Sequence, residues 1–136
     1  MLVHYSSLFI TDVTIGFLPD VYSVSETDGM VTLSVQVLAG QLARPVEVDF
    51  TTQDGTATST APQDYNQAAP ITLLFTPDDL VQQIVVTIIS DEITENSEFF
   101  DGLLTIIDRA VILAPDIASV EVIDDDGEQV SLSTRL

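Results

Sequence analysis

An acidic segment at residues 88–100 carries the residue types best suited to chemistry in this chain. Four carboxylates, Asp91, Glu92, Glu95 and Glu98, fall within eight residues, and no basic residue lies among them. Two carboxylates about 4 Å apart repel by roughly 1 kcal/mol even in bulk water. A hard cation relieves such crowding, and Ca2+ takes about six to eight oxygen ligands from carboxylates, backbone carbonyls and water. The segment is therefore a candidate Ca2+-binding loop.

The overall composition narrows the range of partners. The 136 residues include 22 acidic residues against three arginines and no lysine, so the formal net charge is −19, while 46% of the residues are apolar. This length suits one domain with a hydrophobic core. Nucleic acids and anionic membranes attract basic surfaces, so we expect neither as a partner. No apolar run approaches the roughly 20 residues of a membrane span, so we expect no membrane insertion.

Short runs of β-forming residues, separated by turn residues, predict an all-β fold. Val31, Leu33, Val35 and Val37 alternate with polar residues, which is the period of a half-buried strand. No long stretch has helical periodicity. We predict a seven-stranded antiparallel β-sandwich of the immunoglobulin-like type. The other six strands are expected at residues 13–24 (one two-part edge strand), 46–50, 73–75, 84–88, 100–106 and 120–122.

The acidic turns of this predicted sandwich converge at one end. Consecutive antiparallel strands alternate in direction, so the turns after the first, third, fifth and seventh strands share a pole. Eight carboxylates would meet there, as a site for several Ca2+ ions requires. They are Glu26, Asp54, Asp91, Glu95, Glu98, Asp124, Asp125 and Asp126.

From about Ile15 to Asp126, the chain resembles a Calx-beta domain, a module of sodium–calcium exchangers and of large extracellular proteins with many tandem copies. The resemblance rests on several motifs in a fixed order. They are Tyr22-Ser23-Val24-Ser25-Glu26, the segment at residues 48–57 that contains Asp54-Gly55-Thr56-Ala57, Asp64-Tyr65, the acidic segment, and Ile123-Asp124-Asp125-Asp126.

The resemblance implies a set of Ca2+ ligands. It assigns the eight carboxylates of the pole, together with the backbone carbonyl of Ile93. The strongest binders of the family carry an aspartate where this chain has Ser90, so we expect one ion position to be weakened or absent. Glu92 is expected to be solvated.

Several of these residues also have structural interpretations. Asp64-Tyr65 is expected to be structural, with the Tyr65 ring packed and its hydroxyl hydrogen-bonded. Asp54-Gly55 would also suit a turn with the glycine at positive φ. Gly102, on an inward face, suggests close packing against a large neighbour.

Catalysis is not expected. The chain has a single histidine, His4, and neither cysteine nor lysine, so the usual nucleophile–base pairs cannot be built. We expect residues 1–12 to be an extension, 13–127 the Calx-beta domain, and 128–136 a linker or the start of another copy.

Three functions remain open. The leading expectation is an extracellular Ca2+-binding repeat of an adhesion or matrix protein, with Ca2+, neighbouring domains and another adhesion protein as partners. The alternatives are a cytosolic Ca2+ sensor like that of an exchanger, and a structural spacer that binds no ion. An echo of residues 123–132 in residues 10–17 favours the tandem array.

Overall fold

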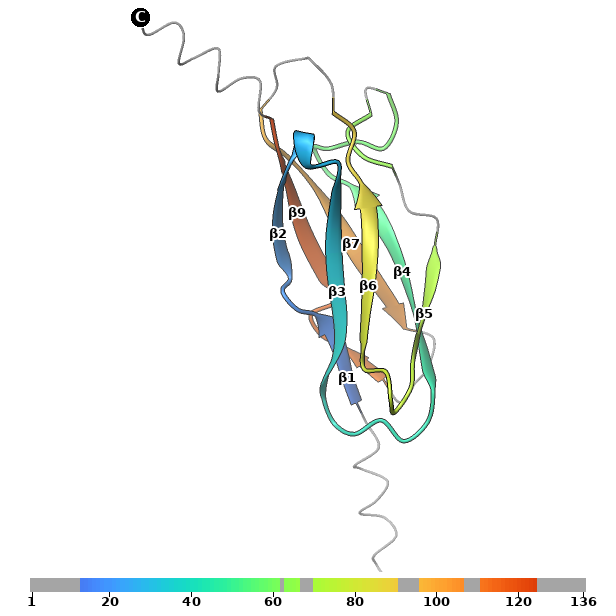
Figure 1. Cartoon of the computed structure of the whole chain (residues 1–136). Coiled ribbons are helices and arrows are strands. Elements are labelled where there is room, and N and C mark those ends of the chain that lie inside the picture. Colours follow the sequence, from blue (N-terminus) through green and yellow to red (C-terminus); the bar gives the residue numbers. More distant parts are fainter. Residues whose placement is uncertain (1–12, 62, 67–69, 91–95, 107–110, 125–136) are drawn as a thin grey trace, which may run out of the picture.

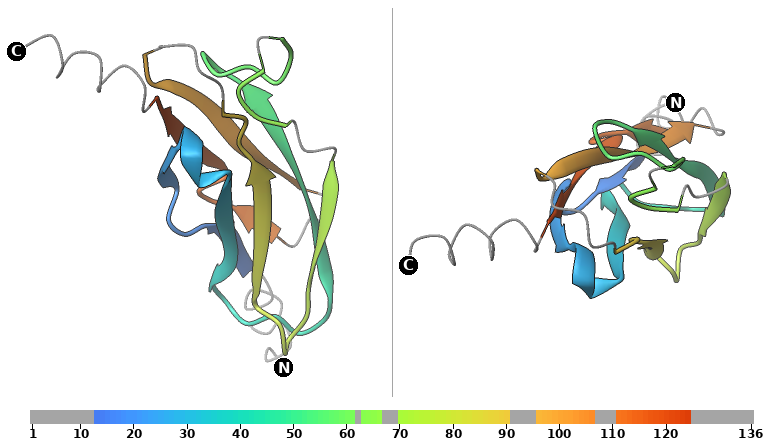
Figure 2. Two further views of the ribbon diagram at one scale, coloured as in Figure 1. Left: turned by 45° about the horizontal axis from the view of Figure 1, so that its top comes forward. Right: turned by 90° about the horizontal axis from the view of Figure 1, so that it is seen from above.

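The computed structural model describes residues 13–61, 63–66, 70–90, 96–106 and 111–124. Two β-sheets face each other in these ranges and form an elongated sandwich (Figures 1 and 2). No helix in the described part of the chain is long and apolar enough to cross a membrane. The elements are β1 (Val13–Phe17), β2 (Val21–Ser25), the 3-10 helix η1 (Glu26–Asp28), β3 (Met30–Ala39), β4 (Val46–Asp54), β5 (Ile71–Phe75), β6 (Val81–Thr87), β7 (Glu98–Ile106), β8 (Val111–Leu113) and β9 (Ile117–Ile123).

The two-sheet, all-β architecture confirms the predicted fold class, but the predicted count of seven strands is wrong. One sheet has the order β6-β3-β1-β8 and the other β2-β9-β7-β4-β5, so the described residues contain nine strands. The run at residues 13–24 is not one edge strand. It divides at Pro19, which has no N–H to continue a ladder, and its halves lie in different sheets.

Two pairings also depart from the predicted antiparallel arrangement. β1 pairs in parallel with β8, and β2 pairs in parallel with β9. In each parallel pair, a strand at the edge of its sheet, β8 or β2, pairs with a strand that is distant in the sequence. The three-residue strand β8 is too short to give the alternating pattern by which a strand is recognised in sequence.

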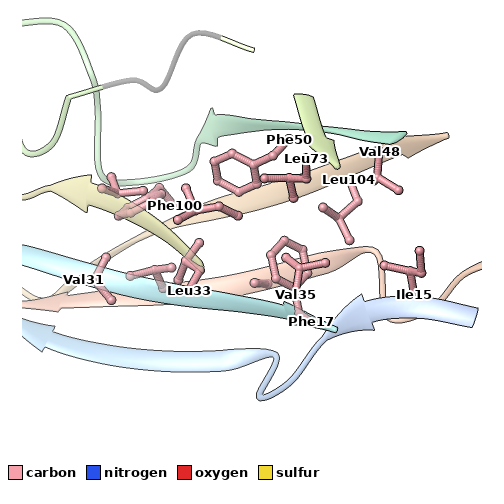
Figure 3. Packing of buried hydrophobic residues seen from close by; sticks show 14 of the residues in the cluster. Ile15, Phe17, Val31, Leu33, Val35, Val48, Phe50, Leu73, Phe100 and Leu104 are labelled. Carbon is pink, nitrogen blue, oxygen red and sulfur yellow. The ribbon is translucent and has the colours of Figure 1, made fainter. Parts of the chain in front are cut away.

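The core lies between the sheets, where alternate side chains of each strand point inward (Figure 3). The Phe17 ring from one sheet meets the Phe50 ring from the other edge-on, with centroids 6.3 Å apart. A Cβ added at Gly102 would lie 3.0 Å from the Phe50 ring and 3.2 Å from a methyl group of Leu33. The expectation that Gly102 permits close packing against a large neighbour is therefore confirmed.

The short helix η1 closes the end of β2. The Ser25 side chain accepts a hydrogen bond from the Thr27 N–H, and the Asp28 carboxylate accepts one from the Ser25 N–H at 2.9 Å. This reciprocal capping satisfies backbone donors that a helix start leaves open. Gly29 ends the helix with a φ of 81°, and Glu26 is thereby held with only 4% of its surface exposed.

Candidate metal centre

Four predicted ligands lie at the ends of four neighbouring strands of one sheet. Glu26 follows β2 and Asp124 follows β9, and the parallel pairing of Ser25 with Ile123 places these two ends side by side. Glu98 begins β7, two residues before Phe100, which pairs with Asp54 at the end of β4. Neighbouring strands lie about 4.8 Å apart. The predicted convergence on one pole is therefore observed for these four residues, at the upper end of the sandwich in Figure 1.

The four acids lie at or directly beyond the ends of these strands, next to buried residues. In each strand the residue two positions closer to the core is buried: Val24 before Glu26, Val122 before Asp124, Phe100 after Glu98 and Thr52 before Asp54. Side chains two residues apart in a strand share a face. Glu98 and Asp54 thus share the inward faces of β7 and β4 with core residues. Glu26 and Asp124 are buried, Glu98 is half-buried and Asp54 is exposed.

The Asp54 carboxylate is fixed by hydrogen bonds from Tyr65 and Ser59. Its Oδ1 accepts a hydrogen bond of 2.5 Å from the Tyr65 hydroxyl and one of 3.1 Å from the Ser59 N–H. The Tyr65 bond, followed by those from Ser59, lowers the pKa of the Asp54 carboxyl below its usual value of 3.8. The Ser59 side chain also hydrogen-bonds this carboxylate.

The glycine after Asp54 has a different role from the one that a turn would require. The positive-φ glycines in the described part of the chain are Gly29 and Gly40, so the interpretation of Gly55 as a positive-φ turn residue is wrong. A Cβ at Gly55 would lie 2.5 Å from the Phe99 carbonyl oxygen, which accepts a hydrogen bond from the Ala57 N–H. Gly55 therefore allows β7 to approach the loop beside Asp54.

The structural interpretation of Asp64-Tyr65 agrees with the contacts. Tyr65 is fully buried, and its ring stacks on Phe100 with centroids 3.9 Å apart and planes 10° apart. The Asp64 carboxylate accepts a hydrogen bond of 2.9 Å from the Thr58 N–H and so closes the loop after β4. The sequence did not indicate that the partner of the Tyr65 hydroxyl is a predicted Ca2+ ligand.

The pKa of Tyr65 predicts a pH dependence for the metal-free protein. Burial, and then the bond to Asp54, raise it from the usual 10.0 to about 12. Because the folded state holds this proton more tightly than the unfolded state, its contribution to stability is complete below pH 10 and is lost as the pH rises to about 12. Urea unfolding over this range should show wild type losing more stability than Tyr65→Phe. Parallel stability profiles would contradict the assignment.

The donor set of the pole fits a hard cation. All of its candidate ligands are oxygens, which Ca2+ prefers, whereas softer metals favour nitrogen and sulfur. Arg44 lies in the loop between β3 and β4, at the other end of strands whose length is about 30 Å. No basic side chain in the described residues stands at the acidic pole, and the chain has no lysine.

The structure brings part of the predicted site together and does not describe the rest. Ser90 is exposed after β6, directly before the acidic segment. In the part of the chain that is described, no group of three acidic or histidine side chains forms a metal site by itself. Five predicted ligands, and the predicted solvated residue Glu92, lie outside the described residues, as does His4. Those ligands are Asp91, Ile93, Glu95, Asp125 and Asp126.

Comparison with known families identifies the module. The family model described as the Calx-beta domain matches residues 11–126. The chain belongs to the Calx-beta family. This assignment confirms the resemblance read from the ordered motifs, and it agrees with the expectation of a module without catalytic function.

The most similar curated proteins include sodium/calcium exchangers. Sodium/calcium exchanger 1 of Cavia porcellus is 32% identical over 123 residues, which is 77% of this chain and 12% of the exchanger. Sodium/calcium exchanger 2 of Homo sapiens is 30% identical over 128 residues, 82% of this chain and 14% of the exchanger. This Calx-beta chain therefore spans about an eighth of the length of the curated relatives.

Solved structures show the same fold. The apo form of the Calx CBD1 domain superposes with a TM-score of 0.77 at 31% identity, and the match covers 85% of this chain and 99% of that domain. The calcium binding domain CBD12 of CALX1.1 gives a TM-score of 0.74 at 32% identity, with 82% of this chain and 44% of that chain covered. The match to that chain leaves more than half of it uncovered.

These relatives correct the expected setting of the module. The expected extracellular localisation is wrong, because the matching proteins are sodium/calcium exchangers. The comparisons give no support to an adhesion or matrix parent. The exchanger-type module, which was the alternative reading, fits the comparisons better. The domain boundaries at residues 12 and 127 stay a prediction.

Proposed function

We propose that this chain is a Ca2+-binding regulatory module of the sodium/calcium exchanger type. The observation that carries the proposal is the row of acids at the neighbouring ends of β2, β9, β7 and β4. Glu26 and Asp124 are only 4% and 7% exposed. Carboxylates gathered at one end of the sandwich repel one another, and their ligation of Ca2+ would offset that repulsion.

We assign the ligands in two groups. Glu26, Asp54, Glu98 and Asp124 are proposed from their position at the pole. Asp91, the carbonyl of Ile93, Glu95, Asp125 and Asp126 are proposed from the family pattern. Bound Ca2+ would supply positive charge that offsets the repulsion among these carboxylates, and the ion would link the ends of β2, β9, β7 and β4.

The position of the site suggests how Ca2+ would act on a neighbouring domain. Asp124 follows the last residue of β9, so the chain leaves the sandwich beside the acidic pole. A cation held there would restrain the start of the connection to a following domain. Support for such a neighbour comes from the CBD12 structures, of which the chain covers 44% and 45%.

Titration calorimetry tests the proposal. The full chain, freed of metal with a chelator and dialysed, should release or take up heat on Ca2+ addition and reach saturation at a defined stoichiometry. Mg2+ should bind much more weakly, because it demands octahedral geometry and gives up its water reluctantly. If the folded protein shows no saturable Ca2+ binding, the module is a structural spacer and the proposed function is wrong.

A further inference from the structure

The segment Asp64-Tyr65-Asn66 packs against the end of β6, where the chain enters the acidic segment. The Ile89 N–H donates to the Asp64 carbonyl at 2.9 Å, and the Asn66 N–H donates to the Thr87 carbonyl at 3.0 Å. Tyr65 forms an antiparallel bridge with Ile88 between these two bonds. The backbone of Tyr65 is therefore fixed against β6 just before the predicted ligand Asp91.

The side chain of Tyr65 reaches two other strands that carry predicted ligands. Its ring stacks on Phe100, which is two residues from Glu98 on β7. Its hydroxyl donates to Oδ1 of Asp54 at the end of β4. The buried residue Tyr65 thus contacts three segments that lead to the acidic pole, although it has no carboxylate of its own.

The hydrogen bond between Tyr65 and Asp54 restrains the Asp54 carboxylate more than the Tyr65 hydroxyl. Thr52 and Ser59 also hydrogen-bond the Tyr65 hydroxyl, so this buried group has other partners. Asp54 is exposed at a strand end, and its Oδ1 accepts hydrogen bonds from the Tyr65 hydroxyl and from the Ser59 N–H. These bonds limit rotation of the carboxylate.

We propose that the Tyr65 hydroxyl is a positioning group for Ca2+: it holds Oδ1 of Asp54 and so orients the carboxylate toward the cation. The inference rests on the Ca2+ site proposed above. Hydrogen-bond partners of metal-ligating carboxylates fix their orientation, and their removal costs roughly 10- to 100-fold in metal affinity. Tyr65 does not coordinate the ion and acts only through Asp54.

The test compares two single-hydroxyl deletions in the full chain. Tyr65→Phe keeps the ring that stacks on Phe100 and should lower Ca2+ affinity at least roughly tenfold in calorimetry, with the β-sheet circular dichroism spectrum unchanged. Tyr22→Phe is the matched control, since the Tyr22 hydroxyl accepts a hydrogen bond from the Ser34 N–H at 3.0 Å and hydrogen-bonds none of the four predicted ligands that the structure describes. It should bind Ca2+ like wild type.

A double-mutant cycle separates positioning from a general structural effect. In an Asp54→Asn background, Tyr65→Phe should cause little further loss of Ca2+ affinity, because the residue through which Tyr65 acts is already changed. An equal fold-loss in both backgrounds would mean that Tyr65 supports the fold and not Asp54, and would overturn the inference. So would wild-type affinity in Tyr65→Phe.

The two proposals fail in different ways. If wild type shows no saturable Ca2+ binding, the proposed function falls and the positioning role falls with it. If wild type binds Ca2+ and Tyr65→Phe binds it equally well, the metal centre stands and only the role of Tyr65 is wrong.

Discussion

Millimolar Ca2+ should raise the midpoint of thermal unfolding of the chelated protein by roughly 10 °C. An ion that binds only the folded state adds about 2.7 kcal/mol at a hundredfold excess over Kd, and each kcal/mol shifts the midpoint of a domain of this size by about 3–6 °C. The physical source is the acidic pole, where buried Glu26 and Asp124 stand beside further carboxylates with no basic residue among the described neighbours. Differential scanning calorimetry with and without chelator measures the shift.

The controls for this stabilisation distinguish a site from general charge screening. Mg2+ at the same concentration screens charge as Ca2+ does but suits the site poorly, so its shift should be a small fraction of the Ca2+ shift. Sodium chloride that matches the ionic strength should give less still, because screening acts mainly on exposed charges. Equal shifts with Ca2+ and Mg2+ would indicate screening of the net charge of −19 and argue against a built site.

The convergence of the acids was predictable because it depends on two simple regularities. Alternation along strands such as β3 identified their faces, and alternation of strand direction assigned the acidic turns to one pole. Glu26 and Asp124 also continue the alternation of Val24 and Val122, so their burial could have been read from the sequence. The alternation of apolar and polar residues, with a period of two, is strong wherever one face of a strand is buried.

Tertiary contacts explain what the sequence could not reveal. Pro19 marked a break, but nothing local showed that the chain changes sheets there, since β1 and β2 each pair with a strand that is distant in sequence, β8 and β9. The contact between Tyr65 and Asp54 joins residues eleven apart across a loop without periodicity. The cellular setting was also beyond the sequence pattern, because carboxylates bind Ca2+ by the same chemistry in any compartment.

Replacing a carboxylate of the pole should change Ca2+ affinity and metal-free stability in opposite directions. Glu98→Gln and Asp124→Asn should each lower Ca2+ affinity by roughly a hundredfold, about 2.7 kcal/mol, because each removes a charged ligand but keeps the size of the side chain. Without Ca2+, Glu98→Gln should unfold at the same or a higher temperature than wild type, since one source of repulsion is gone. Calorimetric titration and metal-free melting curves measure the two effects.

Asp78→Asn provides the matched control for these variants. Asp78 is an exposed carboxylate in the turn between β5 and β6, at the end of the sandwich opposite the acidic pole. The substitution removes the same single charge from the chain, so any effect of net charge alone would appear in it too. Its Ca2+ affinity should equal that of wild type. If Asp78→Asn loses affinity as much as Asp124→Asn does, the protein attracts Ca2+ through its overall charge, and the ligands have been placed at the wrong residues.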